Sequence, residues 1–141
     1  MPEIVHGSAV TFGGRAVLIL GPSGSGKSGL ALDLVSRGAV LVADDRVALE
    51  ATDDGPPRAS PPAGLEGRIE ARGLGLLRTD WKRGVPVALA VDLGQTCDQR
   101  LPPPRTVALC GRPVPLIRAK DAPNLAAAIF VALKGGLEAH D

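Results

Sequence analysis

The chain has 141 residues, of which 45% are hydrophobic and 22% charged, and its formal net charge is +1. That length suits one domain with one core. The scattered basic residues give none of the charge pattern expected of a protein that binds duplex DNA or an anionic membrane. Only three aromatic residues, Phe12, Trp81 and Phe130, are present, which argues against stacking of single-stranded bases.

No apolar run approaches the roughly 20 residues needed to cross a bilayer. The amino terminus lacks a basic segment followed by a long apolar one, and Cys97 and Cys110 have no metal-binding spacing. We therefore expect a soluble, cytoplasmic protein with reduced cysteines, formed by residues 1–141 as a single domain.

The first half of the chain predicts an α/β core. Residues 4–10 form a short apolar segment, and residues 16–20 form a β-favouring run that predicts a buried strand. A glycine-rich stretch, residues 21–26, ends this strand, and apolar residues at helical spacing then predict a helix over residues 27–37. Residues 40–43 predict a further buried strand, so two strands flank a helix.

The second half of the chain contains more residues that interrupt helices and strands. Residues 53–67 contain many prolines and glycines and predict a mobile surface loop near the site. Residues 85–93 and 106–110 predict strands, and a turn region is expected around Pro113 and Pro115. Residues 124–133 favour a helix, with Asn124 as its cap.

One motif carries chemistry on its own. The pattern G-x-x-x-x-G-K-[ST] is matched by eight consecutive residues that follow a predicted strand and precede a predicted helix: Gly21, Pro22, Ser23, Gly24, Ser25, Gly26, Lys27 and Ser28. Glycines let backbone N–H groups converge on phosphate oxygens, and the helix amino end adds partial positive charge. The motif predicts nucleotide binding, with Lys27 at the β- and γ-phosphates and Ser28 on Mg²⁺.

Carboxylates follow the predicted strand at residues 40–43. Its end resembles the strand that places a carboxylate, here Asp44 or Asp45, beside Mg²⁺ and the attacking group. Adjacent residues at a strand end face opposite ways, so the two should have different roles. Glu70 could be a magnesium ligand and Arg72 could neutralise phosphate charge, but spacing alone favours a solvated salt-bridge face.

Several segments, in order, resemble the HPr kinase/phosphorylase family, specifically its carboxyl-terminal catalytic domain. They are His6-Gly7, the loop G-P-S-G-S-G-K-S, the segment R-G-A-V-L-V-A-D-D-R-V from Arg37, the segment I-E-A-R-G-L-G-L-L from Ile69, and N-L-A-A-A-I from Asn124. The resemblance implies an α/β fold with a P-loop core like that of HPr kinase and phosphoenolpyruvate carboxykinase. It also implies a kinase that uses ATP and Mg²⁺ to phosphorylate a serine of HPr, the phosphocarrier of the sugar phosphotransferase system. Many members also remove that phosphate with inorganic phosphate, which yields pyrophosphate.

The same resemblance assigns roles to matched positions. It implies that His6, Lys27 and Asp45 are active-site residues, and that Asp45 takes the proton from the serine hydroxyl. Ser28 and Glu70 would hold Mg²⁺, and Arg100 is similar to the catalytic arginine of the family. Residues 69–77 would form a segment needed in both directions of the reaction.

The chain also departs from the family pattern. Gly29 stands where an acidic residue is usual, and P-L-I-R-A-K from Pro115 replaces a P-V-R-P-G-R segment linked to dephosphorylation. The family's amino-terminal domain is absent, which resembles the short form found in α-proteobacteria and implies an HPr-like regulatory phosphocarrier as the target. Full-length relatives form hexamers, so a homo-oligomer is expected.

Two other functions remain open at this point. A small-molecule P-loop kinase or nucleotide hydrolase would explain the loop and the paired aspartates, but not the segment from Ile69. A non-catalytic nucleotide-sensing module would bind ATP without turnover. Lys27, Asp45 and Glu70 argue against the sensing module, because binding alone would not require all three.

Overall fold

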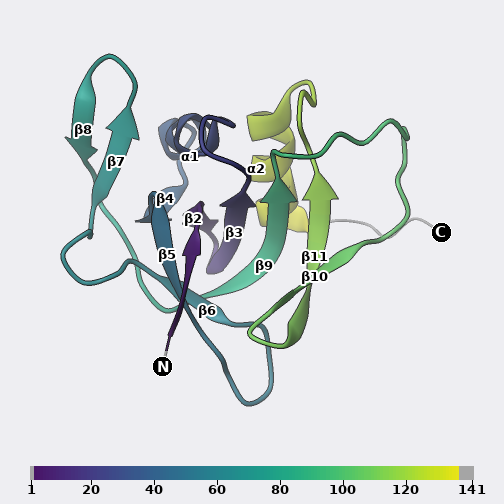
Figure 1. The fold of residues 1–141 in the computed structure, drawn as a ribbon, viewed down its shortest axis with the longest axis horizontal. Helices are drawn as coiled ribbons and strands as arrows, with labels where there is room; N and C mark the ends of the chain where they lie inside the picture. Colours follow the sequence, from purple (N-terminus) through teal and green to yellow (C-terminus); the bar gives the residue numbers. More distant parts are fainter. Residues whose placement is uncertain (1, 137–141) are drawn as a thin grey trace.

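The structure, a computed structural model, describes residues 2–136 and combines one large sheet with two helices and a separate hairpin (Figure 1). The strands and helices are β1 (Glu3–His6), β2 (Ser8–Phe12), β3 (Arg15–Leu20), α1 (Lys27–Ser36), β4 (Val40–Ala43), β5 (Arg46–Glu50), β6 (Arg58–Ser60), β7 (Arg68–Ala71), β8 (Gly75–Arg78), β9 (Val85–Asp92), β10 (Thr106–Leu109), β11 (Arg112–Arg118) and α2 (Leu125–Gly135). The predicted α/β class is confirmed.

The large sheet is mixed. Its main strand order is β1-β5-β6-β9-β3-β2-β4, with β11 parallel beside β9 and β10 beside β11. The strand that precedes the glycine loop, β3, is central and pairs in parallel with β9. The hairpin β7–β8 stands apart from this sheet at the upper left of Figure 1.

Alternation along β3 divides the core between the two faces of the sheet. Val17 and Ile19 belong to a buried cluster with residues of α1 and α2. Ala16 and Leu18 belong to a second cluster, which includes residues of β5, β6 and β10. Both faces of β3 are therefore buried, which explains its uninterrupted apolar sequence and fixes the strand that carries the glycine loop.

Four strands end at one edge of the sheet. Leu20 of β3 pairs with Asp92 of β9, which in turn pairs with Arg118 of β11. The strand β4 runs in the same direction, because β2 is antiparallel to both β3 and β4. The segments that follow these strands consequently meet, and this edge is where α/β sheets place ligands.

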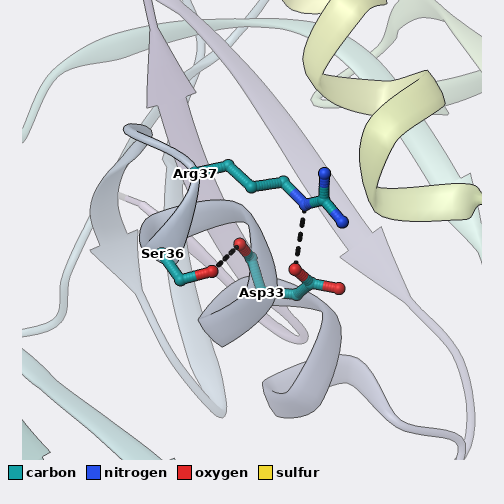
Figure 2. A network of polar contacts seen from close by, with 3 residues as sticks. All are labelled: Asp33, Ser36 and Arg37. Atoms are coloured by element: carbon teal, nitrogen blue, oxygen red, sulfur yellow. Dashed lines mark hydrogen bonds and ion pairs between the residues drawn. The ribbon is translucent and has the colours of Figure 1, made fainter.

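The carboxyl end of α1 differs by one residue from the predicted end. The helix stops at Ser36, and Arg37 follows as its cap, with Gly38 next in a left-handed conformation at φ 116°. Figure 2 shows Arg37 reaching back to Asp33, with Nε 2.9 Å from Oδ1. Ser36 Oγ also donates to the carbonyl of Asp33 at 2.6 Å. Both ionic side chains are about half exposed, so the pair adds only about 0.3–0.5 kcal/mol.

The structure contains strands that the sequence did not predict and differs from the expected loop. The apolar segment of residues 4–10 belongs to two strands that meet at Gly7, and β5 was not predicted. The expected mobile loop over residues 53–67 contains β6, whose Ala59 is fully buried between its neighbours β5 and β9. In Figure 1, β6 lies at the end of the sheet opposite α1, away from the glycine loop.

The expected turn at Pro113 and Pro115 is the strand β11. The N–H of Leu116 donates to the carbonyl of Arg105 on the β10 side. Because neighbouring residues of a strand alternate, the backbone nitrogens of Pro113 and Pro115, which carry no N–H, face away from β10. Because β9 pairs with β11 only from Leu116 onward, no ladder bond is lost.

The expected cap residue Asn124 is confirmed in its position but not in its side-chain hydrogen bond. Asn124 does precede α2, but its backbone is left-handed at φ 54° and its side chain makes no capping hydrogen bond. No helix within residues 2–136 is long and apolar enough to cross a membrane.

Both cysteines are free and half-buried. Burial raises the pKa of the Cys110 thiol above its usual value, and the nearby Glu3 carboxylate, 3.7 Å from Sγ, raises it further. Because only the thiolate reacts, we expect iodoacetamide to modify Cys110 more slowly than glutathione at pH 8. Replacing Glu3 by Gln should shift the pH–rate midpoint downward, whereas Glu50→Gln should not. Mass spectrometry would measure both, and an unshifted midpoint in Glu3→Gln would contradict the electrostatic contribution.

Candidate functional site

The glycine loop lies between β3 and α1, as its motif predicted. Gly21 has φ 148°, and a Cβ at this position would lie 2.6 Å from Ser25 Oγ, so only glycine fits. Lys27 begins α1, and its Nζ donates to the carbonyls of Gly21 at 2.8 Å and Pro22 at 3.0 Å. The first turn of a helix leaves backbone N–H groups without helical partners. The loop thus combines free donors, the helix dipole and an ammonium group.

Asp44 connects four elements beside the loop. Its Oδ1 accepts hydrogen bonds of 2.7 Å from both Ser8 Oγ of β2 and Ser28 Oγ of α1. Its Oδ2 accepts one of 3.0 Å from the backbone N–H of Glu70 in β7. Asp44 itself follows β4. This carboxylate therefore fixes the position of the hairpin and the orientation of the Ser28 hydroxyl.

Asp45 has different surroundings, as the alternation of side chains predicted. Its backbone is left-handed at φ 71°, a conformation that Asp adopts more readily than most residues. Its carbonyl accepts the N–H of Gly7 at 3.1 Å, while its side chain is 78% exposed. Arg46 approaches this carboxylate only at 4.0 Å, and both groups are exposed, so the pair is weak. Asp45 is left available to an external group.

Gly7 allows this arrangement. A Cβ at Gly7 would lie 2.7 Å from the carbonyl oxygen of Ile19 in β3. The close approach lets the chain pass from β1 to β2 against β3 and brings the Gly7 N–H to Asp45. The His6-Gly7 pair noted in the sequence thus has a structural reason at Gly7.

A cavity of about 380 Å³ brings most of the predicted residues together. Lys27, Ser28, Asp45 and Glu70 line it together with part of the glycine loop, and Arg72 adds a second positive charge. Asp44 lies behind them through its bond to Ser28. The cavity combines cations with carboxylates, the set of groups that phosphoryl transfer requires.

The structure does not bring all predicted residues to this cavity. His6 is exposed at the end of β1, next to Gly7, but it does not line the cavity. Arg100 is exposed in the connection between β9 and β10 and lines neither this cavity nor the neighbouring one described below. That connection runs along the right side of Figure 1, whereas the β7–β8 hairpin lies at the left. The catalytic roles of His6 and Arg100 stay predictions.

Sequence reasoning missed Ser8. This residue is fully buried and donates its hydroxyl to Asp44. A serine that precedes the apolar residues of a buried strand was the available signal, since a buried hydroxyl needs a partner.

The oxygen groups suit a hard cation with few protein ligands. Within residues 2–136, no group of three or more His, Cys, Asp or Glu side chains forms a metal cluster. Ser28 donates its only hydroxyl proton to Asp44, which leaves the lone pairs of its oxygen free. Asp44 uses three of about four acceptor positions in the bonds described above. The arrangement fits Mg²⁺, which usually takes one or two protein groups together with phosphates and water.

We expect Asp44→Ala to lower the free energy of unfolding by about 1–3 kcal/mol, because it leaves the buried Ser8 hydroxyl without an acceptor. Chemical denaturation would measure the change, and Asp53→Ala, at an exposed loop residue, is the matched control. Adding Ser8→Ala should restore part of the loss. Equal stability of Asp44→Ala and wild type would contradict the role of Asp44 in connecting these elements.

Comparison with known proteins gives a consistent result. The family model described as HPr Serine kinase C-terminal domain matches residues 2–86. HPr kinase/phosphorylase of Bordetella pertussis is 52% identical over 73 residues, which are 52% of this chain and 24% of that protein. The enzyme of the same name from Geobacillus sp. is 49% identical over the same shares. The match thus spans about a quarter of the length of these curated relatives.

A solved structure extends the similarity to nearly the whole chain. It is described as the Hpr(Ser) kinase/phosphatase from Coxiella burnetii, and its TM-score is 0.78 at 26% identity. The superposition covers 94% of this chain and 88% of the other. Residues beyond 86, which the family model does not match, therefore share its fold as well.

Proposed function

This chain belongs to the HPr kinase C-terminal domain family, and from that membership we propose that it is an ATP-dependent protein-serine kinase acting on HPr or an HPr-like phosphocarrier of the phosphotransferase system. The observation that carries this proposal is the single cavity lined by Lys27, Ser28, Asp45 and Glu70. These residues supply a phosphate-binding cation, metal-binding oxygens and a free carboxylate. The similarity to enzymes named HPr kinase/phosphorylase supports the same reaction.

The glycine loop would hold the phosphates of ATP. Its backbone N–H groups and the amino end of α1 offer partial positive charge. Lys27 would turn from the carbonyls of Gly21 and Pro22 toward the β- and γ-phosphates, since its present partners are neutral groups and a phosphate is charged. Arg72, in the same cavity, would neutralise further charge.

Mg²⁺ would be held by Ser28, with Glu70 and Asp44 as nearby carboxylates. When bound, the ion neutralises phosphate charge and orients the phosphate to be transferred. Because Ser28 donates its hydroxyl proton to Asp44, the lone pairs of the Ser28 oxygen point away from Asp44. It also fixes the backbone of Glu70, so both candidate ligands depend on one carboxylate.

Asp45 would accept the proton of the acceptor serine as its hydroxyl oxygen attacks the γ-phosphorus, while the bond from that phosphorus to the β–γ bridging oxygen breaks and ADP leaves. A carboxylate that is 78% exposed at the rim of the cavity can be reached by a side chain on another protein. This exposure favours a protein acceptor over a small metabolite, since small-molecule kinases normally enclose their substrates. The left-handed backbone at Asp45 holds the side chain at that position.

The same family membership supports a second reaction, in which inorganic phosphate removes the phosphoryl group from the phosphocarrier and gives pyrophosphate. It also supports a cytoplasmic location and self-association into an oligomer. Each of these parts of the proposal has its own measurement. Phosphate-dependent loss of label from the phosphocarrier tests the second reaction, cell fractionation tests the location, and analytical ultracentrifugation tests the oligomer.

The test is incubation of the protein with γ-labelled ATP, Mg²⁺ and the HPr-like proteins of its own organism. Labelled phosphoserine on the acceptor is expected, and omission of Mg²⁺ should prevent it. Added phosphate should then release labelled pyrophosphate if the second reaction exists. Binding of ATP without labelling would contradict the kinase proposal and favour a nucleotide-sensing module. Labelling of a small metabolite would favour a small-molecule kinase.

A further inference from the structure

Gly29 lies in the first turn of α1, at a position where the fold does not require glycine. Its φ is not in the left-handed region that favours glycine. Among residues 2–136, no atom lies within 4 Å of a Cβ placed there, apart from the adjoining residues and the backbone of the helix. Glycine weakens a helix relative to alanine, because it loses more backbone entropy on folding. Alanine would therefore fit and would stabilise the helix.

The open space over Gly29 belongs to the cavity that holds the reacting groups. Gly29 lines the cavity of about 380 Å³ together with Asp45 and Glu70. It does not line the neighbouring cavity, of about 540 Å³, which shares part of the glycine loop as a wall. A side chain at this position would consequently enter the cavity in which phosphoryl transfer is proposed.

The residues around this space are largely aliphatic. Leu32 follows Gly29 by three residues, so both lie on one face of α1, and Leu32 is half-buried against the core. Ala71 is buried and lines the cavity from β7, which packs against α1. Arg72, beside it, is exposed and can keep its guanidinium group in water while its stem covers apolar surface. This part of the cavity suits an uncharged, aliphatic group.

We propose that the space over Gly29 receives an aliphatic side chain of the acceptor protein, one that flanks the serine to be phosphorylated. Gly29 is then a specificity-determining residue, an inference that rests on the proposed kinase function. The Asp45 side chain in the same cavity is 78% exposed, so a serine that reaches it brings its neighbours in the acceptor chain to the cavity walls. Any side chain at position 29 would fill the space that such a neighbour needs.

The test separates acceptor binding from nucleotide binding. Gly29→Leu fills the space and Gly29→Ala fills part of it, with Gly135→Leu and Gly135→Ala as matched controls. Gly135 is also a helical glycine with no atom of the described residues within 4 Å of a Cβ, and it lines neither cavity. Steady-state kinetics with the HPr-like protein that the wild type labels would give KM and kcat. Calorimetry would give the ATP affinity, and thermal unfolding would check the fold.

We expect Gly29→Leu to raise the KM for the acceptor protein by about ten-fold or more. The ATP affinity and the kcat at saturating acceptor should stay within about two-fold of wild type, because the lost interaction is one of acceptor binding. Gly29→Ala should raise the KM by a smaller factor, although its Tm should rise by about 2–4 °C. Both Gly135 variants should leave the KM unchanged. If Gly29→Leu does not fold, Gly29→Ala provides the same comparison.

A compensating change in the acceptor makes the test specific. Truncation to alanine of one aliphatic residue beside the acceptor serine should restore part of the KM of Gly29→Leu, because it leaves room for the leucine. An unchanged KM in Gly29→Leu, or no recovery from any such truncation, would overturn the proposal. An equal loss of ATP affinity would assign the space to the nucleotide instead. Failure of the wild-type protein to label any protein acceptor would overturn the proposed kinase function, and this inference with it.

Discussion

Replacing Asp45 by Asn is expected to lower the rate of phosphoryl transfer by about 10²- to 10⁴-fold, the usual contribution of a general base. Nucleotide affinity should change by only a few-fold, because the role proposed for Asp45 is toward the acceptor serine and not toward the nucleotide. Asn keeps the size of the side chain and tolerates the left-handed backbone at φ 71°. The substitution therefore removes the proton acceptor and little else.

Single-turnover kinetics with the labelled phosphocarrier would measure this effect, since they report the transfer step itself. The matched control is Asp54→Asn, which changes an exposed loop carboxylate outside the cavity. A transfer rate equal to that of wild type in Asp45→Asn would refute the proton-accepting role. A parallel loss of nucleotide affinity would place Asp45 on the phosphate side instead.

Lys27→Ala is expected to weaken ATP binding and transfer together. A charge-assisted hydrogen bond contributes about 1.5–3 kcal/mol, so the affinity should fall by roughly 10- to 150-fold. The ammonium group also holds the carbonyls of Gly21 and Pro22. Its loss should loosen the start of the loop in the free protein.

Calorimetric titration with ATP and Mg²⁺ would measure the affinity, and Lys82→Ala is the control because Lys82 is exposed and lines neither cavity. Lys27→Arg keeps the charge with a larger, planar group and should recover only part of the binding. Equal ATP affinity in Lys27→Ala and wild type would contradict the phosphate-loop assignment.

Local signals predicted the elements that carry the loop. The apolar run of β3, the glycine stretch and the helical spacing of α1 are each encoded by neighbouring residues, and all were confirmed. The same holds for β4 and for β9. In these segments backbone preference, burial pattern and turn chemistry agree, so sequence pattern alone sufficed.

Elements fixed by distant partners were not predicted. The short strand β6 has a Pro-Pro pair on each side, and it exists because β5 and β9 both pair with it. The prolines of β11 are tolerated because their nitrogens, which lack an N–H, face an edge of the strand that has no hydrogen-bonded neighbour at these positions. Sequence propensity cannot report which edge of a strand has a neighbour.

The residues of the candidate site divide in the same way, into those that local sequence predicts and those that only the fold brings together. The motif predicted Lys27 and Ser28, and the strand end predicted Asp44 and Asp45. Spacing left the role of Glu70 open and the resemblance assigned it to Mg²⁺; the structure brings this residue to the same cavity as Lys27, Ser28 and Asp45. Ser8, by contrast, contacts Asp44 from 36 positions away in the chain, and only the fold reveals that contact.

The position of β9 has a consequence for how the protein is made. This strand lies between β6 and β3, although both precede it in the chain. During synthesis, the strand that carries the glycine loop therefore keeps an open edge until residue 92 has left the ribosome. Unpaired edges of this kind recruit other chains. A nascent chain stalled before β9 would be a target for chaperones and a source of aggregates, even though nearly all of its family-matched residues had been synthesised.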